Sequence, residues 1–321
     1  MRGARPFAAL EQSVLDAFAA IAPGPIAIAC SGGPDSVALL AAASAVARPA
    51  GRTLVALHVN HSLRATADRD EGVALAAAVH LGVIFKSVRL EPGASDEAAL
   101  RERRYPALVA MALEAAAVAI ATAHTLEDQV ETVLLALVRG AGLRGIAGMP
   151  ERRPLAEGLE LLRPLLEHGH AELRAYCHAR ALPYALDESN QDQRYRRNRL
   201  RRLLAQLRDV EPSAEGAIVR LARLAREEDN WLDDQAAQAL ARLAAQEGRL
   251  EGSLRHLPRP LLRRVLRLWL GERDIAFEHV DRLAGAVAEG RSGRFFIRKG
   301  EEVRIHDGLL ERCKSDDGER A

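Results

Sequence analysis

Residues 26–36, which read IAIACSGGPDS, decide the fold of this chain. The first five residues, Ile26–Cys30, are apolar and follow Pro25, so they are predicted to form a short buried strand. A doubled glycine then leads into a helical pattern over 35–47. Glycines let the backbone turn sharply and approach an anion, and a helix N-terminus supplies free N–H groups. The stretch therefore predicts a phosphate-binding turn between a strand and a helix.

Strands and helices alternate around this turn. Further strands are predicted at Thr53–Val59, Val83–Leu90 and Val118–Thr122, with helices at 68–81, 96–117 and 126–138. Strands that alternate with helices of ten or more residues indicate parallel βαβ units. We therefore expect an α/β fold with a doubly wound parallel sheet, which binds ligands outside the C-terminal ends of its strands.

The pattern changes after Pro150. Residues 151–165 are predicted to be a loop, and the chain beyond about 213 shows helical patterns at 213–246, 258–270 and 278–289, followed by a hairpin at Arg294–Arg298 and Glu302–His306. The break Glu211-Pro212-Ser213 marks a boundary. We predict a catalytic domain over 1–208 and a mainly helical domain over 209–321 that ends in a small β hairpin.

Composition excludes several classes of protein. The 321 residues include 45 basic and 44 acidic side chains, so the net charge of +1 identifies no partner. Cys30, Cys177 and Cys313 form no C-x-x-C pair, which argues against a disulfide framework, a zinc ribbon and a cysteine-ligated cluster. Apolar stretches fall short of the roughly 18 residues of a membrane span. We expect a cytoplasmic protein without a membrane partner or an evident obligate protein partner.

The glycine turn carries the strongest chemical pattern. Ser31 and Ser36 add hydroxyl donors, whereas Asp35 would repel phosphate unless a magnesium ion lay between them. The alternative is an ordinary glycine turn in which serine and aspartate cap a helix. The preceding strand and the doubled glycine favour the phosphate site.

A second candidate cluster follows the strand near 118–122. His124, Asp128 and Glu131 are spaced i, i+4 and i+7, which would place them on one face of a helix at the C-terminal edge of the sheet. A histidine–carboxylate pair there could deprotonate an amine, and a further carboxylate could hold a cationic amino group. The alternative is a solvated helix face.

Arginine dominates the basic residues, because Lys86, Lys299 and Lys314 are the only lysines. Six arginines fall within the nine residues 194–202, a density typical of phosphate binding. A second cluster, between Arg255 and Arg267, forms the basic face of an amphipathic helix that could grip RNA or simply be solvated. Arg101 and Arg104, one turn apart, could meet phosphates or a carboxylate, with a solvated face as the alternative.

Residues 31–36 resemble the PP-loop of the N-type ATP pyrophosphatases. Four further stretches are similar to the tRNA(Ile)-lysidine synthetase family of that superfamily: Leu57–Arg64 (LHVNHSLR), Arg101–Tyr105 (RERRY), Ala123–Gly145, and Asp187–Asn190 (DESN) with Arg197-Asn198-Arg199. Together the stretches span about 26–202. The resemblance implies an adenine nucleotide alpha hydrolase-like fold and a second, tRNA-binding domain. It also implies that ATP adenylates the wobble cytidine of an isoleucine tRNA with a CAU anticodon, and that free L-lysine then displaces AMP.

The resemblance assigns roles to individual residues. It implies that ATP or pyrophosphate is bound by Ser31, Gly32, Gly33, Pro34, Asp35 and Ser36. The implied catalytic residues are Asp35, His124 and Asp128, and Asp35 would also hold Mg²⁺. Lysine would be bound by Glu131 and Arg101, and tRNA by Arg104, Arg194, Arg197, Asn198, Arg199 and Arg201. Two positions depart from the family pattern, because Thr125 and Glu127 stand where a second histidine and an aspartate are usual. The alternatives are a tRNA thiolase of the same superfamily and a non-catalytic RNA-binding adaptor.

Overall fold

The computed structural model describes residues 7–60, 67–91, 97–185, 196–246, 248–251, 254–271 and 275–314, of which only the backbone is described at 97–101, 196–199, 201 and 244–246. Contacts divide the chain into two units, Met1–Arg223 and Leu224–Ala321. Within the described ranges, no helix has the length and apolar character needed to cross a membrane.

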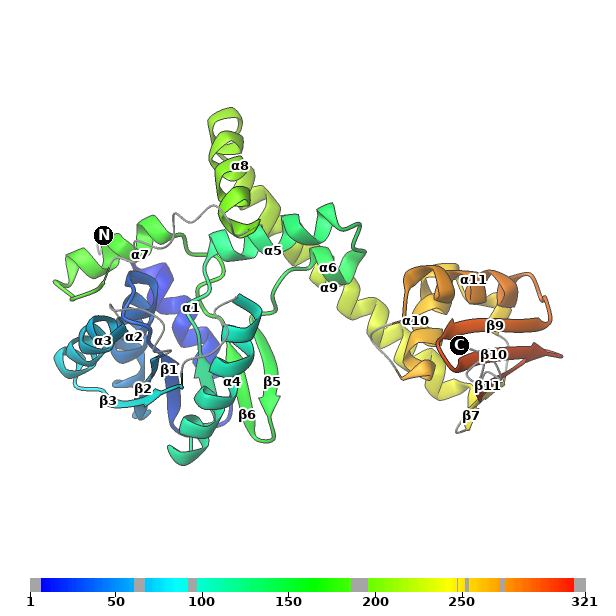
Figure 1. Ribbon diagram of the computed structural model, residues 1–321, viewed down its shortest axis with the longest axis horizontal. Coiled ribbons are helices and arrows are strands. Elements are labelled where there is room, and N and C mark those ends of the chain that lie inside the picture. Colours follow the sequence, from blue (N-terminus) through cyan, green and yellow to red (C-terminus); the bar gives the residue numbers. More distant parts are fainter. Residues whose placement is uncertain are drawn as a thin grey trace, which may run out of the picture. The chain divides into compact units, whose positions relative to one another are not determined.

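The first unit is a six-stranded sheet with helices on both faces (Figure 1). Its strands are β1 (Ile26–Ala29), β2 (Leu54–Asn60), β3 (Ile84–Arg89), β4 (Ala119–Ala121), β5 (Arg152–Ala156) and β6 (Leu159–Leu162). Its helices are α1 (Ala8–Ala19), α2 (Pro34–Ala47), α3 (Ala67–Leu81), α4 (Glu97–Glu114), α5 (Leu126–Val138), α6 (Leu143–Ile146), α7 (His170–Ala179) and α8 (Arg196–Val210). The order β3-β2-β1-β4-β6-β5 places β1, which precedes the glycine turn, between β2 and β4.

The core explains why the central elements form. β1 pairs in parallel with β2 and β4 on its two edges, and helices cover both of its faces, so an all-apolar sequence is required. α2 is buried along most of its length because α1, α3 and α7 surround its small alanine side chains. α4 covers the opposite face of the sheet through Leu108, Met111 and Ala112. The predicted α/β class is confirmed.

The predicted loop at 151–165 is wrong. β5 and β6 form a hairpin there, and β6 joins β4 in parallel while β5 runs antiparallel to β6. The sheet is therefore mixed and not purely parallel. The strand pattern of β5 could not be recognised because this strand carries two arginines and Pro154. β6 is stabilised by pairing with β4, which is distant in the sequence, so its own short sequence gives little signal.

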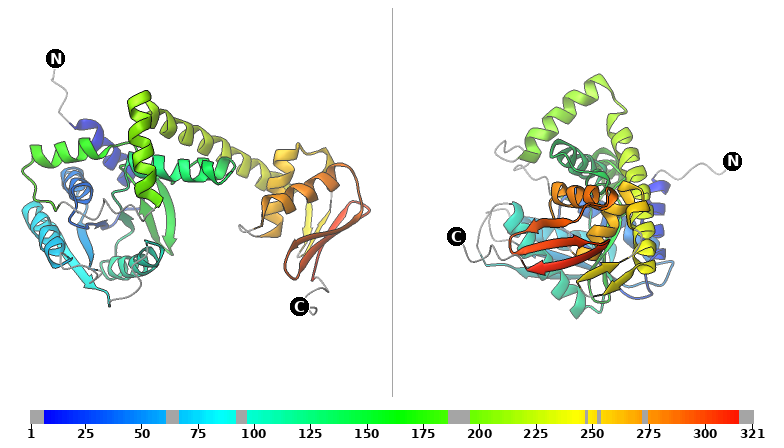
Figure 2. Two further views of the ribbon diagram at one scale, coloured as in Figure 1. Left: turned by 45° about the horizontal axis from the view of Figure 1, so that its top comes forward. Right: turned by 90° about the vertical axis from the view of Figure 1, so that its right-hand side faces the viewer.

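The second unit is not purely helical, which corrects the predicted mainly helical domain with one hairpin. It contains a five-stranded antiparallel sheet of order β7-β8-β11-β10-β9 (Figure 2). Its strands are β7 (Ala244–Gln246), β8 (Arg249–Glu251), β9 (Gly293–Arg298), β10 (Glu301–His306) and β11 (Leu309–Lys314); its helices are η2 (Leu254–His256), α10 (Arg259–Leu270) and α11 (Phe277–Ala288). Three-residue strands and the charged β11 carry too little periodicity to be recognised.

The division between the units falls within α9 (Ala214–Arg242), after Arg223 and not at the Glu211-Pro212-Ser213 break. The first turns of α9 contribute Ile218 and Val219 to a cluster with Val130 of α5 and Leu204 of α8. This packing ties the start of α9 to the first unit. A tRNA-binding role for the second unit remains a prediction.

Candidate active site

The glycine turn lies between β1 and α2 at the C-terminal edge of the sheet. Gly32 has φ +89°, and a Cβ atom there would lie 2.5 Å from the carbonyl oxygen of Asp70, so only glycine fits. Gly33 is the N-cap of α2 and Pro34 occupies the first helical turn. The turn therefore points the free N–H groups at the start of α2 out of the sheet edge, as an anion site requires.

The hydroxyl of Ser36 holds this turn in shape. It accepts a hydrogen bond from the Ser31 N–H at 3.1 Å and donates one to the Gly33 carbonyl oxygen at 2.9 Å. The Ser31 hydroxyl lies a further 3.1 Å from it. The loop is thus organised by its own side chains.

Asp35, in the first turn of α2, faces a histidine that begins α7. His170 Nδ1 lies 3.0 Å from Asp35 Oδ2, while Asp35 Oδ1 is buried with no hydrogen-bond partner among the described residues. The hydrogen bond to Asp35 raises the pKa of His170, an effect opposed by burial and reinforced by the charges of Glu127 and Asp128. One carboxylate oxygen is therefore fixed by the His170 ring, and the other meets no donor among the described residues.

Glu127 holds the histidine from the other side. Its carboxylate accepts the His170 backbone N–H at 3.0 and 3.2 Å, and Glu127 Oε2 lies 3.8 Å from His170 Nε2. Glu127, one of the two positions that depart from the family pattern, thus caps α7. Sequence reasoning missed His170, because no local sequence pattern marks this histidine. Its contact with Asp35 forms only when α7 packs against α2.

The predicted helix face of His124, Asp128 and Glu131 is not formed as expected. α5 begins at Leu126, with Thr125 as its N-cap, so His124 precedes the helix. Thr125 and Asp128 form a capping box: Asp128 Oδ2 accepts the Thr125 N–H at 3.0 Å, and Thr125 Oγ1 accepts the Asp128 N–H at 3.4 Å. His124 Nδ1 instead lies 2.9 Å from Thr122 Oγ1. The Thr125-x-x-Asp128 spacing was a readable capping pattern.

Glu131 lies on the inner side of α5 and is 1% exposed. Two residues earlier, the buried Gln129 amide binds the backbone of Met149 through both its oxygen and its nitrogen, at 2.7 and 3.0 Å. α5 is therefore fixed to the segment that precedes β5. A catalytic role for Asp128 and a lysine-binding role for Glu131 remain predictions.

The predicted tRNA contacts are only partly within the described structure. Arg104 on α4 is half-buried. The backbone of Arg101 lies in α4, and the backbones of Arg197, Asn198, Arg199 and Arg201 lie in α8, but their side chains are outside the described structure, as is all of Arg194. The 194–202 cluster thus continues into a helix, and its binding role remains a prediction.

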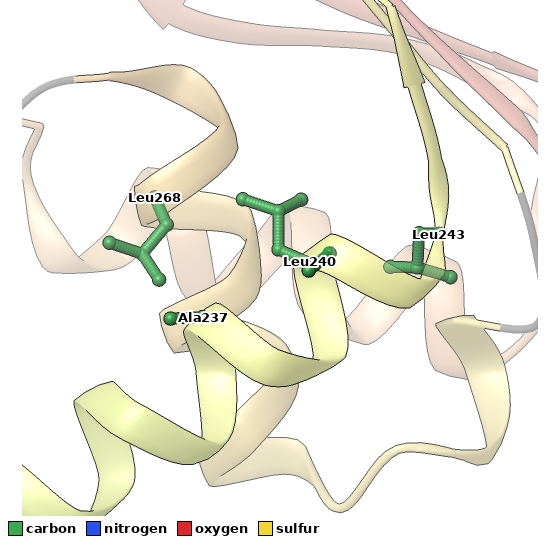
Figure 3. Close-up of a pocket in the computed structure, with 5 residues that line it drawn as sticks. Ala237, Leu240, Leu243 and Leu268 are labelled. Carbon is green, nitrogen blue, oxygen red and sulfur yellow. The ribbon is translucent and has the colours of Figure 1, made fainter.

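Three arginines of the second basic cluster form ion pairs within the protein. Asp281 of α11 accepts hydrogen bonds from Arg259 and Arg263, each at 2.8 Å, and Arg264 pairs with Asp229 and Asp233 of α9. These three arginines link three helices of the second unit through ion pairs, and a role of the cluster in gripping RNA remains a prediction. A shallow groove nearby is apolar, lined by Ala237, Leu240, Ala241, Leu243 and Leu268 (Figure 3).

Three further side chains of the first unit, those of Cys30, Cys177 and His58, are buried. Cys30 and Cys177 are buried, which raises the pKa of both thiols, that of Cys177 to about 12. Cys313 lies in the second unit. His58 is also buried, and its Nδ1 atom is 2.8 Å from the Cys30 carbonyl oxygen.

A glycine turn between a buried strand and a helix, with serine hydroxyls and an acid in the first helical turn, defines a PP-loop protein. In agreement, a family model described as a PP-loop domain matches residues 8–207. The chain is 41% identical to the tRNA(Ile)-lysidine synthase of Salinispora arenicola (strain CNS-205) over 327 residues, with 96% of each chain covered. It is 42% identical to that of Salinispora tropica over 288 residues, with 86% of each covered. The chain belongs to the tRNA(Ile)-lysidine synthase family.

A solved structure supports the fold independently of close sequence identity. The U34-tRNA thiolase NcsA from Methanococcus maripaludis, solved with its [4Fe-4S] cluster, matches with a TM-score of 0.57 and 17% sequence identity. The match covers 68% of this chain and 78% of the thiolase. At this identity the likeness concerns the α/β fold alone.

Proposed function

We propose that this chain ligates free L-lysine to the wobble cytidine of the isoleucine tRNA with a CAU anticodon, at the expense of ATP. The observation that carries the proposal is the 41% identity to a tRNA(Ile)-lysidine synthase over 96% of both chains. In the first step the cytosine carbonyl oxygen attacks the α-phosphorus of ATP and pyrophosphate leaves. In the second, the lysine ε-amine attacks the activated ring carbon, AMP leaves and the amine loses a proton.

The PP-loop supplies the pyrophosphate site in this proposal. The N–H groups at the start of α2, which no earlier helical turn satisfies, face the leaving group together with the Ser31 hydroxyl. These donors favour the negative charge that grows on pyrophosphate as the bond to the α-phosphorus breaks. Ser36 maintains the turn, and Gly32 and Gly33 keep the backbone free of side chains.

Asp35 fits a magnesium ligand. Its Oδ1 atom is buried without a protein hydrogen bond, and Mg²⁺ in nucleotide sites is held by one or two carboxylates plus phosphate oxygens. A site of this kind does not need three protein ligands, and the described part of the chain contains no group of three or more His, Cys, Asp or Glu side chains able to hold a metal ion. When bound, Mg²⁺ would neutralise phosphate charge; His170 and Glu127 keep the Asp35 carboxylate oriented.

The amine step uses the segment around α5. We assign His124 to accept the proton that the lysine amine loses, because its ring is half-exposed at the C-terminal end of β4. Asp128 positions this segment through the capping box, and Glu131 and Arg101 bind the ammonium and carboxylate groups of lysine. Arg104 and the arginines of 194–202 bind the tRNA.

Pyrophosphate release measured with omission of single substrates tests this function. The proposed ligase releases pyrophosphate only when tRNA and ATP are both present, and AMP leaves in step with lysine incorporation. A thiolase would release pyrophosphate and AMP with tRNA and a sulfur donor but without lysine, whereas an RNA-binding adaptor would bind tRNA with no release. Either of the last two results would contradict the proposal.

A further inference from the structure

Tyr105 on α4 is flanked by two arginines that come from different elements. The guanidinium carbon of Arg104 lies 5.6 Å from the Tyr105 ring centroid, and that of Arg153, on β5, lies 5.9 Å from it. Both are within the range in which a cation is attracted to an aromatic ring. The sequence resemblance included Arg104 but gave no role to Arg153.

This cluster lies toward the edge of the sheet that carries the PP-loop. β5 runs antiparallel to β6, so its first residues, Arg152 and Arg153, pair with the last residues of β6, Leu162 and Leu161. β6 is parallel to β4, and Leu162 pairs with Ala121, where β4 ends. Arg153 therefore lies near the C-terminal ends of the parallel strands, where such sheets bind ligands.

Neither arginine has a counter-charge among the described residues. Among the described residues, no carboxylate forms an ion pair with Arg104 or Arg153; Arg153 Nη1 donates only to the Pro154 carbonyl oxygen, at 3.1 Å. Arg104 Nε is buried and has no hydrogen-bond partner within the described part of the chain. The neighbouring Arg152, by contrast, pairs with Glu160 at 2.9 Å.

An anion bound beside this cluster would supply a counter-charge for the two guanidinium groups. A buried N–H group without a partner costs about 1–3 kcal/mol, and two cations gathered on one ring repel each other. The planar N–H fork of arginine matches the oxygens of phosphate or carboxylate in a bidentate manner. The cluster thus has the chemistry of an oxyanion site.

The position of the cluster separates it from the pyrophosphate site. β4 and β6 lie between β1, which leads to the PP-loop, and β5. With strands about 4.8 Å apart, β5 is roughly 14 Å from β1 across the sheet. The cluster and the PP-loop therefore start from strands three positions apart in the sheet, and the backbone of a long substrate can reach both places.

We propose that Arg104, Tyr105 and Arg153 form a binding site for one backbone phosphate of the tRNA, with Arg153 as a further tRNA-binding residue. The site rests on the proposed function and adds to it a second anchor, on the β5 edge of the sheet. Tyr105 holds the two guanidinium groups in place through its ring.

The test compares Arg153→Ala with Arg174→Ala, which removes an exposed arginine on α7 of the same unit and so controls for net charge. We expect Arg153→Ala to raise the Kd for tRNA about tenfold, the loss of a charge-assisted contact. The slope of log Kd against log salt should fall by about 0.7–0.9, as for one phosphate. Arg153→Lys should keep most of the slope and lose part of the affinity, and Arg174→Ala should resemble wild type.

Steady-state kinetics identify the anion. The KM values for ATP and lysine, measured at saturating tRNA, should stay within about twofold of wild type. A Kd and salt slope for Arg153→Ala equal to those of Arg174→Ala would overturn the site, as would a raised KM for lysine or ATP with unchanged tRNA affinity. Wild-type protein that forms no lysidine would instead refute the proposed function, so the two failures are distinguishable. Melting curves for all variants identify any loss of folded protein, and Arg153→Gln, which keeps a polar stem, replaces the alanine variant if that one unfolds.

Discussion

Two sets of arginines have opposite surroundings in this protein. On α10, in the second unit, Arg259 and Arg263 share Asp281, and Arg264 pairs with Asp229. On α4 and β5, in the first unit, Arg104 and Arg153 contact a tyrosine ring and form no ion pair with any described carboxylate. The α10 set is the denser one in the sequence, yet it is the one whose charge is already neutralised.

The difference shows that local arginine density does not reveal which guanidinium groups are already paired with an acid in an arginine-rich chain. A guanidinium group paired with an acid is already satisfied and mainly joins helices, whereas one without a counter-charge is available for an anion. The same contrast separates the acids: Asp281 is held by two arginines, while Asp35 has one buried oxygen with no hydrogen-bond partner among the described residues. Replacement of charged groups such as Asp35 in the first unit should therefore lower catalytic turnover. Replacement of paired charged groups such as Asp281 in the second unit should lower the free energy of unfolding of that unit.

The largest effect is expected at Asp35. Asp35→Ala should reduce tRNA-dependent pyrophosphate release by about 10²–10³-fold, the usual effect of removing one group that stabilises transition-state charge. The melting temperature should change little, because a loop-proximal acid is not part of the core. Asp281→Ala is the matched control and should retain turnover. Equal turnover in the two variants would contradict the contrast between the units.

His170 tests whether Asp35 must be held in position. His170→Ala should lower kcat for pyrophosphate release about tenfold, which corresponds to about 1.4 kcal/mol of transition-state stabilisation. His170→Asn, whose side-chain amide can donate to Asp35 in place of Nδ1, should recover part of the loss. Full turnover in the alanine variant, or no recovery with asparagine in a folded protein, would show that the histidine does not position Asp35.

The arginine clusters can be compared directly by the salt dependence of tRNA binding. Replacement of Arg197 and Arg199 by alanine should reduce the slope of log Kd against log salt by roughly two units if each meets a phosphate. Replacement of Arg259 and Arg263, which are paired with Asp281, should leave the slope within about half a unit of wild type. The reverse result would mean that counter-charge within the protein does not decide which arginines bind RNA.

Stability of the second unit can be followed separately, because both tryptophans of the chain, Trp231 and Trp269, lie in it. Asp281→Ala should lower the free energy of unfolding by about 1 kcal/mol, since the pairs that it breaks are partly exposed. Hydrogen bonds from Arg263 and then Arg259 lower the pKa of Asp281 in the folded protein. Ionised Asp281 therefore stabilises the fold fully above its unfolded pKa of about 3.9, and this stabilisation is lost as the pH falls through its lower folded pKa.

Urea unfolding followed by tryptophan fluorescence measures this contribution. The wild type should lose stability between the two pKa values of Asp281, and Asp281→Ala should lose less over the same interval. An unchanged free energy of unfolding at neutral pH would show that the ion pairs do not stabilise the unit.

The smallest effect is expected from the cysteines. Simultaneous replacement of Cys30, Cys177 and Cys313 by alanine should leave the turnover per folded molecule within about twofold of wild type, because the proposed nucleophile is an amine and neither step involves sulfur. The fraction of folded protein is measured by circular dichroism. Loss of turnover in a folded triple variant would favour thiolase chemistry.

Local patterns predicted the catalytic half of the molecule well. The strand–turn–helix at Ile26–Ser36 was predictable because a central parallel strand must be apolar on both faces and because a tight turn at Gly32 requires glycine. Helix 126–138 matched the observed bounds, since the capping spacing and amphipathic pattern agree with each other. Where local preference and tertiary environment coincide, a single sequence is sufficient.

Features that depend on distant pairing were not predictable. β6 forms because it joins β4, and β11 forms because it lies between β10 and β8; neither has a distinctive local pattern. His170 and Arg153 acquire their surroundings only when α7 meets α2 and when β5 meets α4. The acids that neutralise α10 likewise come from α9 and α11, so its surface charge could not be inferred from the helix alone.

The most direct measurement is mass spectrometry of the wobble nucleoside after incubation of the purified protein with isoleucine tRNA (CAU anticodon), ATP and isotopically labelled lysine. The predicted product is lysidine: cytidine whose mass is increased by one lysine less one water, with the full isotope label and a dependence on ATP. Asp35→Ala should give unmodified cytidine. Cytidine that remains unmodified with the wild-type protein, or a product that contains sulfur in place of lysine, would contradict the assignment of this chain as a lysine–tRNA ligase.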